Sequence, residues 1–391
     1  MRLGDCGKTN LHTYSDKEKW SLIRYLDTGS ITEGRIDEIQ TLYPGVDKIP
    51  SRARRKASVG DILFSTVRPN QKHYGIIEAG TENLLVSTGF TVVTVDTTIA
   101  DPYFIYYYLT QSSVIESLQA IAEQSTSTYP SIKPSDIEDI ELDLPELETQ
   151  KKIGSTLRML DRKIALNEEI NDNLEQQAQS YFQELFVDNA DPEWAIGTIS
   201  DLGTIVGGST PSKAKPEYYT ESGIAWITPK DLSINKSKFV SHGENDITEL
   251  GLKNSSAAIM PEGTVLFSSR APIGYIAIAA GEVTTNQGFK SVVPKPEIGT
   301  PFVYFFLKNT LPVIEGMASG STFKEVSGST MKNVPAVIPD AETLAKFSDF
   351  CAPIFAQQRI LEEQNQSLAT LRDNLLPKLM SGEIDVSAVQ L

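Results

Sequence analysis

The chain has 391 residues, enough for two or three domains, with 40% hydrophobic residues, 22% charged residues and a net charge of −16. Its two cysteines and three scattered histidines exclude a disulfide framework and a cysteine-based zinc site, so we expect no structural metal. No apolar run approaches the roughly 18 residues of a membrane span, and no signal-peptide core follows Met1, which predicts a cytoplasmic protein.

The first third of the chain contains a basic segment. Between Lys48 and Gly75 there are seven lysines and arginines and a single acid, so this stretch has a net charge of +6 inside an acidic protein. DNA binding depends on where the cations lie and not on the total charge, so the segment is predicted to contact DNA phosphates. The candidate contacts of this first module are Arg52, Arg54, Arg55, Lys56, Arg68, Asn70 and Lys72. The alternative is that this basic segment is a solvent-exposed surface that does not contact DNA.

Short strands and helices are predicted around this segment. Ile62–Phe64 and Phe90–Val95 are strand-like runs that follow a glycine closely. Asp101 before Pro102 supplies an N-cap and a first-turn proline, which predicts the start of a short aromatic-rich helix. The sequence Asp101-Pro102-Tyr103 lacks the second proline of the Asp-Pro-Pro-Tyr motif of adenine methyltransferases, and no glycine-rich cofactor loop precedes it. We therefore predict no catalytic residue.

Residues 146–187 carry a heptad pattern. Leu157, Leu160 and Ile164 begin a series at alternating spacings of three and four residues, which Asn167 and Asn171 interrupt. This pattern is typical of a coiled-coil seam, in which a polar residue fixes the register at some cost in stability. A helix of about 40 residues cannot bury such a seam alone and needs a partner helix.

The second module, residues 188–340, is less basic. Its glycine-rich turn Gly207–Ser212 lacks the lysine of a P-loop, but its backbone N–H groups and hydroxyls suit a DNA phosphate. The candidate contacts here are Thr210, Ser212, Lys213, Lys215, Lys230, Arg270 and Lys324. Val265–Phe267 is a further strand-like run, and Thr300 as an N-cap before Pro301 at the first helical position predicts a second helix start.

The sequence contains an internal repeat. Residues 127–186 align without a gap on residues 321–380, and upstream of them Gly60–Ser65 resembles Gly263–Ser268 while Thr88-Gly89-Phe90 resembles Gln287-Gly288-Phe289. The prediction is a mixed α/β fold with two pseudo-repeated modules joined by two long antiparallel coiled-coil helices. The predicted segments are 1–145 and 188–340 for the modules, 146–187 and 341–381 for the helices, and 382–391 for a tail.

Several motifs resemble one family. The helix entry Leu144-Pro-Glu-Leu-Glu-Thr-Gln-Lys-Lys-Ile153, the C-terminal Leu375–Ile384, and the second-module motifs Ser269-Arg-Ala-Pro-Ile-Gly274 and Asn286-Gln-Gly-Phe289 are similar to those of the specificity subunits of type I restriction–modification systems. The resemblance covers essentially the whole chain.

The resemblance implies two target-recognition domains, each of which reads one half of a bipartite site in double-stranded DNA. It also implies that the helices hold two methyltransferase subunits, which bind S-adenosylmethionine, and that motor-nuclease subunits supply an ATP- and magnesium-dependent activity. None of these cofactors is expected on this chain, which would be non-catalytic and have no membrane partner.

Two other functions compete with this one. A coiled-coil adaptor that never touches DNA would need only the helices. A self-contained adenine methyltransferase would need a cofactor loop and an intact catalytic motif, which the sequence lacks.

Overall fold

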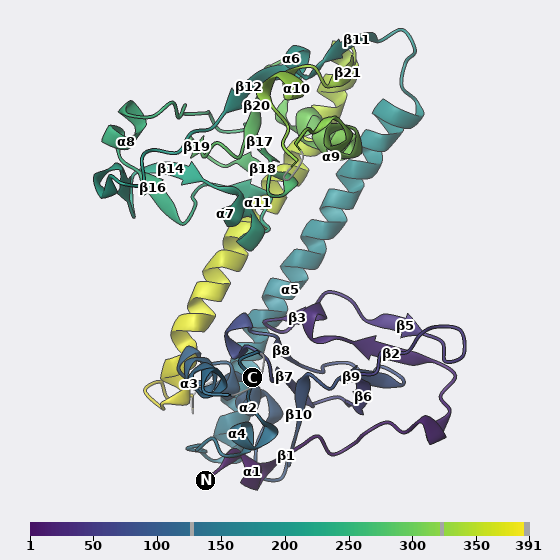
Figure 1. Cartoon of the computed structure of the whole chain (residues 1–391), viewed down its shortest axis with the longest axis vertical. Coiled ribbons are helices and arrows are strands. Elements are labelled where there is room, and N and C mark those ends of the chain that lie inside the picture. The colour runs from purple at the N-terminus through teal and green to yellow at the C-terminus, as the bar shows by residue number, and fades with distance from the viewer. Residues whose placement is uncertain (126–128, 321–323, 387–391) are drawn as a thin grey trace. The chain divides into compact units, whose positions relative to one another are not determined.

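The computed structural model describes residues 1–125, 129–320 and 324–386. They form two compact units: Met1–Ile164 with Ser367–Leu391, and Ala165–Gln366. Each unit contains one α/β module together with parts of both long helices (Figure 1). The division into five segments predicted above is a finer one, and it stays a prediction.

The module of the first unit contains two four-stranded sheets. The first has the strand order β1-β10-β7-β8, with β1 (Gly7–Thr9), β7 (Ile62–Ser65), β8 (Tyr74–Ile76) and β10 (Phe90–Val95). The second has the order β5-β2-β9-β6, with β2 (Ile23–Leu26), β5 (Gln40–Leu42), β6 (Ala53–Lys56) and β9 (Leu84–Ser87). The remaining elements are α1 (Leu3–Cys6), β3 (Ile31–Thr32), β4 (Arg35–Ile36), α2 (Pro102–Leu109), α3 (Ser112–Glu123) and α4 (Pro134–Glu138).

The module of the second unit repeats this plan. Its larger sheet has the order β12-β20-β17-β18-β15, with β12 (Gly203–Gly207), β15 (Phe239–Val240), β17 (Val265–Ser269), β18 (Ile273–Ala279) and β20 (Lys290–Pro294). A second sheet, β13-β16-β14-β19, contains β13 (Tyr219–Thr220), β14 (Ile224–Ile227), β16 (Asn245–Ile247) and β19 (Thr284–Thr285). A two-stranded sheet of β11 (Ala195–Thr198) and β21 (Pro335–Ile338) closes the module, and the helices are α6 (Ile199–Leu202), α7 (Pro229–Ile234), α8 (Glu249–Lys253), α9 (Thr300–Met317) and α10 (Gly328–Lys332).

The two modules share a sheet topology. The order β1-β10-β7-β8 of the first corresponds strand by strand to β12-β20-β17-β18 of the second. The central strands are buried on both faces, since every residue of β7 and of β17 is buried. Fully buried strands read as continuous apolar runs, which is why the two runs were recognisable as strands in the sequence.

Both predicted helix starts are present, with different caps. Asp101 caps α2, because its carboxylate accepts a hydrogen bond from the Phe104 amide at 2.9 Å. The prediction for Thr300 was wrong in detail: Gly299 is the N-cap of α9, and the Thr300 hydroxyl donates to the Gly263 carbonyl at 2.7 Å instead. Because the Thr300 hydroxyl is engaged in this hydrogen bond to Gly263, it does not cap the helix.

Two long helices complete the fold, α5 (Leu147–Gln183) and α11 (Ala341–Met380). Within each unit they pack antiparallel: Asp161 pairs with Arg372 in the first, and Asn167 bonds to Asn365 and Phe182 packs on Phe347 in the second. Of the predicted seam residues, Leu157 and Asn167 are fully buried, and Leu160 and Ile164 are half-buried; Ala178 and Cys351, farther along the two helices, are also fully buried. The predicted fold class is therefore confirmed. No helix among the described residues is long and apolar enough to span a membrane.

Candidate nucleic-acid interface

Each module contains the same hydrogen-bonded turn. In the first, the backbone N–H of Thr66 and its hydroxyl both donate to the Gly89 carbonyl, at 2.8 and 2.9 Å. In the second, the N–H and hydroxyl of Ser269 donate to the Gly288 carbonyl at 2.7 and 3.1 Å. In each module a further segment bonds to the turn: the Ile132 amide donates to the Thr66 carbonyl in the first, and the Val326 amide to the Ser269 carbonyl in the second, each at 2.9 Å.

A residue with left-handed backbone lies beside each turn. Arg68 precedes Pro69 with φ +47°, and Ala271 precedes Pro272 with φ +51°. Residues with a side chain rarely adopt this conformation, and it costs of order 1–3 kcal/mol. The surroundings impose it twice, at corresponding places. Such strain is concentrated at functional sites, so we place the candidate interface at this pair of turns.

In the second module the turn gathers charged and polar side chains. Arg270 lies 3.4 Å from Glu325, and Lys290 lies 3.9 Å from the other oxygen of the same carboxylate. Burial lowers the pKa of Lys290, and Glu325 opposes that shift. The hydroxyl of Thr210 hydrogen-bonds to the side-chain carbonyl of Gln287, whose backbone carbonyl accepts from Lys290 at 3.4 Å. The predicted contacts Thr210 and Arg270 therefore belong to one connected cluster.

Glycine is required in the Gly207–Ser212 turn of the second module for a steric reason. A Cβ on Gly208 would lie 1.9 Å from the Asn286 carbonyl oxygen and 2.4 Å from that of Thr285. Only glycine allows this approach. The contact brings the Gly207–Ser212 turn against the Asn286–Gly288 turn, which is why Thr210 reaches Gln287.

The other predicted contacts of the second module lie in exposed loops or short helices. Lys215 and Lys230 form ion pairs with Glu217 and Glu244, at 3.6 and 2.6 Å. Ser212, Lys213 and Lys324 are exposed. The structure gives no contact that joins these five residues to the cluster around Gln287, so their role in DNA contact stays a prediction.

In the first module, two segments meet at the corresponding turn. Arg52 is exposed, and its carbonyl accepts from the Thr88 amide at 2.9 Å, while Thr66 bonds to the adjacent Gly89. Arg68 is exposed and lies 5.4 Å from the ring centre of Tyr129. Asn70 is exposed in the turn that follows. The structure thus brings Arg52 and Arg68 toward one turn.

The remaining predicted cations of the first module are engaged within it. The Arg55 guanidinium hydrogen-bonds to the Asn10 side chain and to the Phe90 carbonyl, and burial lowers its pKa. Lys56 pairs with Glu18 and Lys72 with Glu33, each at 2.5 Å. Arg54 lies in β6 and is half-buried. These four stay candidates for DNA contact, and Arg55 also has a structural role.

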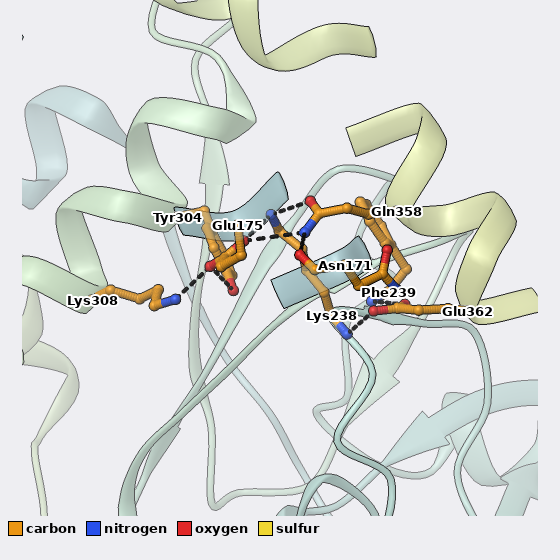
Figure 2. A network of polar contacts seen from close by, with 8 residues as sticks. All are labelled: Asn171, Glu175, Lys238, Phe239, Tyr304, Lys308, Gln358 and Glu362. Atoms are coloured by element: carbon orange, nitrogen blue, oxygen red, sulfur yellow. Dashed lines mark hydrogen bonds and ion pairs between the residues drawn. The ribbon is translucent and has the colours of Figure 1, made fainter. Parts of the chain in front are cut away.

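A buried polar network holds the second module on its helices (Figure 2). The Lys238 ammonium donates to Glu175 of α5 at 2.7 Å and to Gln358 of α11 at 2.9 Å, with only 6% of its side chain exposed. Glu362 accepts from the amides of Lys238 and Phe239 at 2.8 and 3.0 Å. Burial lowers the pKa of Lys238 to about 8. Burial opposes the charge of Glu175, but Lys238 and Lys308 together lower its pKa.

This network is linked to the candidate interface through the sheet. The Lys238 carbonyl accepts from the Ile278 amide at 2.7 Å, and β15 pairs with β18. β18 begins at Ile273, directly after the turn at Arg270–Pro272. The two helices therefore fix the strand that leads out of the turn.

The comparison with known proteins decides the family. A family model described as type I restriction modification DNA specificity domain matches residues 53–176 and 192–371, which is most of the chain. The chain belongs to this family. It is a specificity subunit with two recognition domains, a non-catalytic component of type I restriction–modification systems. The alternative of a self-contained methyltransferase is thereby wrong.

Individual relatives agree with this assignment. The type I restriction enzyme HindI specificity subunit of Haemophilus influenzae is 25% identical, over 98% of this chain and 98% of its own. The MjaIX specificity subunit of Methanocaldococcus jannaschii is 38% identical over 47% of this chain and 45% of its own. The crystal structure of the type I restriction–modification S subunit from M. genitalium has a TM-score of 0.58 at 17% identity and covers 97% of this chain and 95% of that one, which supports the fold.

Three residues of the interface cluster were not predicted as contacts: Gln287, Lys290 and Glu325. They are distant in sequence from Arg270 and Thr210, and only the sheet register brings them together. The repeat carried a usable signal, since Gln287-Gly288-Phe289 matches Thr88-Gly89-Phe90. Gln287 therefore stood out in the sequence as the residue that differs inside an otherwise repeated turn.

Proposed function

We propose that this specificity subunit reads a bipartite site in double-stranded DNA, with each module contacting one half-site through its repeated turn. The observation that carries the proposal is the turn itself. The same strained backbone and the same three-way hydrogen bonding occur in both modules, each with an arginine at the turn, Arg68 or Arg270. The same backbone turn in two modules, with different side chains in each, suits a DNA site whose two halves differ in sequence.

Lysine and arginine would position each module on phosphates, while side chains of the turn reach base edges in the major groove. The exposed Arg52 and Arg68 in the first module, and Lys213 and Lys324 in the second, suit phosphate contact because their charges are accessible to a ligand. Loss of one such contact should reduce the salt dependence of binding by about one unit of slope.

The partners in this proposal are two methyltransferase subunits docked on the helices and motor-nuclease subunits that join them in the cytoplasm. In the second unit, Leu166 and Ile170 lie one turn apart on α5 with 49% and 36% exposure, and Ile360 on α11 is 47% exposed. In the first unit, Met159 and Leu371 are 52% and 46% exposed. Apolar side chains exposed on these helices suit a protein interface. S-adenosylmethionine would bind the methyltransferase subunits, and ATP and magnesium the motor-nuclease subunits, with none on this chain.

Filter binding with and without the methyltransferase subunits tests the proposal. We expect the assembled complex to retain DNA that carries one bipartite sequence in preference to shuffled DNA. The motif is obtained by mapping methylated adenines in a host that carries the system. A complex that assembles but binds every DNA equally would favour the coiled-coil adaptor and contradict the proposed function.

A further inference from the structure

In the first unit, one carboxylate joins the module to both long helices. Asp161 of α5 accepts hydrogen bonds from the Tyr107 hydroxyl of α2 at 2.6 Å and from the Arg372 guanidinium of α11 at 2.7 Å. Tyr107 is buried, and the side chains of Arg372 and Asp161 are 25% and 31% exposed. This polar cluster therefore takes one side chain from the module and one from each helix.

The same three positions are apolar in the second unit. The internal repeat aligns Asp161 with Phe355 and places Ala178 at the position of Arg372. The aligned aromatic-rich helices α2 and α9 place Phe305 at the position of the tyrosine. Phe305 and Phe355 are buried, with their ring centres 6.1 Å apart. A ring contact thus stands where the first unit has a hydrogen bond to a carboxylate.

The second unit has its own polar cluster at other positions. Lys238 donates to Glu175 of α5 at 2.7 Å and to Gln358 of α11 at 2.9 Å (Figure 2). The repeat aligns Glu175 with Ala369 and Gln358 with Ile164, and both of these apolar residues lie in the first unit. The helix positions that are polar in one unit are therefore apolar in the other.

A module on the wrong helix segments would leave buried groups without partners. The second module at the first position would place Lys238 against Ala369 and Ile164, with neither a carboxylate nor an amide to accept its hydrogen bonds. The first module at the second position would deprive Glu175 of Lys238 and also of Lys308, its second ion-pair partner. Removing one partner of a buried ion pair is strongly unfavourable, because the remaining charge stays buried without compensation.

We propose that these two clusters assign each module to its own helix segments, so that the two module positions of this chain are not interchangeable. The second module requires a helix pair that presents a carboxylate and an amide, and the first requires one that presents a carboxylate and a guanidinium. This assignment goes beyond the proposed function, because it concerns how the modules dock within the chain and not which DNA they contact.

The test compares full-length chains in which the modules, the helix residues or both are exchanged. In the transposed chain, residues 188–340 come before residues 146–187, and residues 1–145 come between these and residues 341–391. The helix exchange swaps the aligned residues of the two clusters by Asp161→Phe, Phe355→Asp, Ile164→Gln, Gln358→Ile, Glu175→Ala, Ala369→Glu, Ala178→Arg and Arg372→Ala.

Either exchange alone should weaken docking, and the two together should restore it. Amide hydrogen exchange of the chain without DNA measures docking directly. With one exchange alone, the amides of β15 and β18 should exchange at least about tenfold faster than in the wild type, because Lys238 loses its buried partners. With both exchanges, Lys238 again meets a carboxylate and an amide, so the rates should return to within about threefold of the wild type.

A control and a second measurement accompany these chains. Gln176→Thr with Thr370→Gln swaps an exposed aligned pair one residue beyond Glu175 and Ala369, and it should leave the exchange rates unchanged. In complex with methyltransferase subunits, the chain with both exchanges should methylate a motif whose two halves stand in reversed order.

The contrary results are distinct. If the transposed chain is as well protected as the wild type without the helix exchange, the positions are interchangeable and the proposal is wrong. The proposal also fails if the helix exchange does not restore the transposed chain, including the case in which that chain stays unfolded. Restored protection with no methylated motif in any chain, the wild type included, would contradict the proposed function and leave the assignment of the modules intact.

Discussion

Arg52 and Arg55 lie three residues apart in one basic run, but their side chains have different surroundings. Arg52 is exposed beside the turn at Thr88. Arg55 is half-buried, and its guanidinium satisfies the Asn10 side chain and the Phe90 carbonyl. The sequence shows only four cations in five residues, and it contains no sign that one of them bonds inward. Sequence reasoning ranks such residues by charge, whereas the structure separates them by their contacts.

This difference predicts opposite effects for two alanine substitutions. Arg55→Ala should lower the free energy of unfolding by about 2 kcal/mol, because it leaves two acceptors without a charged donor. Arg52→Ala should leave stability unchanged and reduce the salt slope of DNA binding by about one unit if it contacts one phosphate. Denaturant unfolding of the chain and salt titration of the complex measure the two effects. An Arg52 variant with an unchanged slope would show that this side chain is merely solvated.

At the scale of elements, the heptad pattern and its repeat predicted α5 and α11 closely. Residues spaced alternately by three and four positions over this length fit few structures other than a long helix packed on another. The β strands were recognised where they are buried on both faces. Residues 140–144 form no strand: Glu141 bridges Arg2, and the amides of Leu3 and Leu142 donate to the carbonyls of Ile140 and Met1, whereas the copy of this run in the second module forms β21. Pairing across a sheet depends on the partner segment, which a local pattern does not contain.

The position of Lys238 was also not predictable. In the sequence it lies in the polar stretch Asn235–Lys238, typical of a surface loop. Its burial arises from Glu175 and Gln358, which are 63 and 120 residues away. It also lies over aromatic rings, 3.6 Å from the centre of Phe355. A buried lysine with this many partners joins the second module to both helices.

Replacing this lysine should therefore weaken the second unit. Lys238→Met should lower the free energy of unfolding by about 3 kcal/mol, because it removes one partner from a buried charged network. Glu175 keeps Lys308 as a partner, which limits the loss. The control is Lys236→Met, two residues away and exposed, which should have little effect. Denaturant unfolding of both variants decides between them, and equal stabilities would show that the network contributes nothing net.

At the scale of the whole molecule, the internal repeat gives two similar modules, and in the proposed function each would read DNA separately. The two ends of the second module lie next to each other, because its first strand β11 pairs with its last strand β21, from Ala195 opposite Ile338 to Thr198 opposite Pro335. A segment whose two ends are adjacent can be replaced with little disturbance of the rest. The repeat in the sequence predicted this organisation, because equal modules each followed by an equal helix are the simplest structure for it.

Exchanging residues 188–340 for the corresponding module of the Haemophilus influenzae relative should therefore change one half of the methylated motif and leave the other half as it was. The reason is that the first module and both helices, which carry the proposed contacts to the methyltransferase subunits, are retained. Mapping of methylated adenines in a host with the exchanged chain measures the outcome. The reciprocal exchange of residues 1–145 is the matched control, and it should alter only the opposite half. If either exchange gives an active complex in which both halves of the motif change, the modules do not read DNA independently.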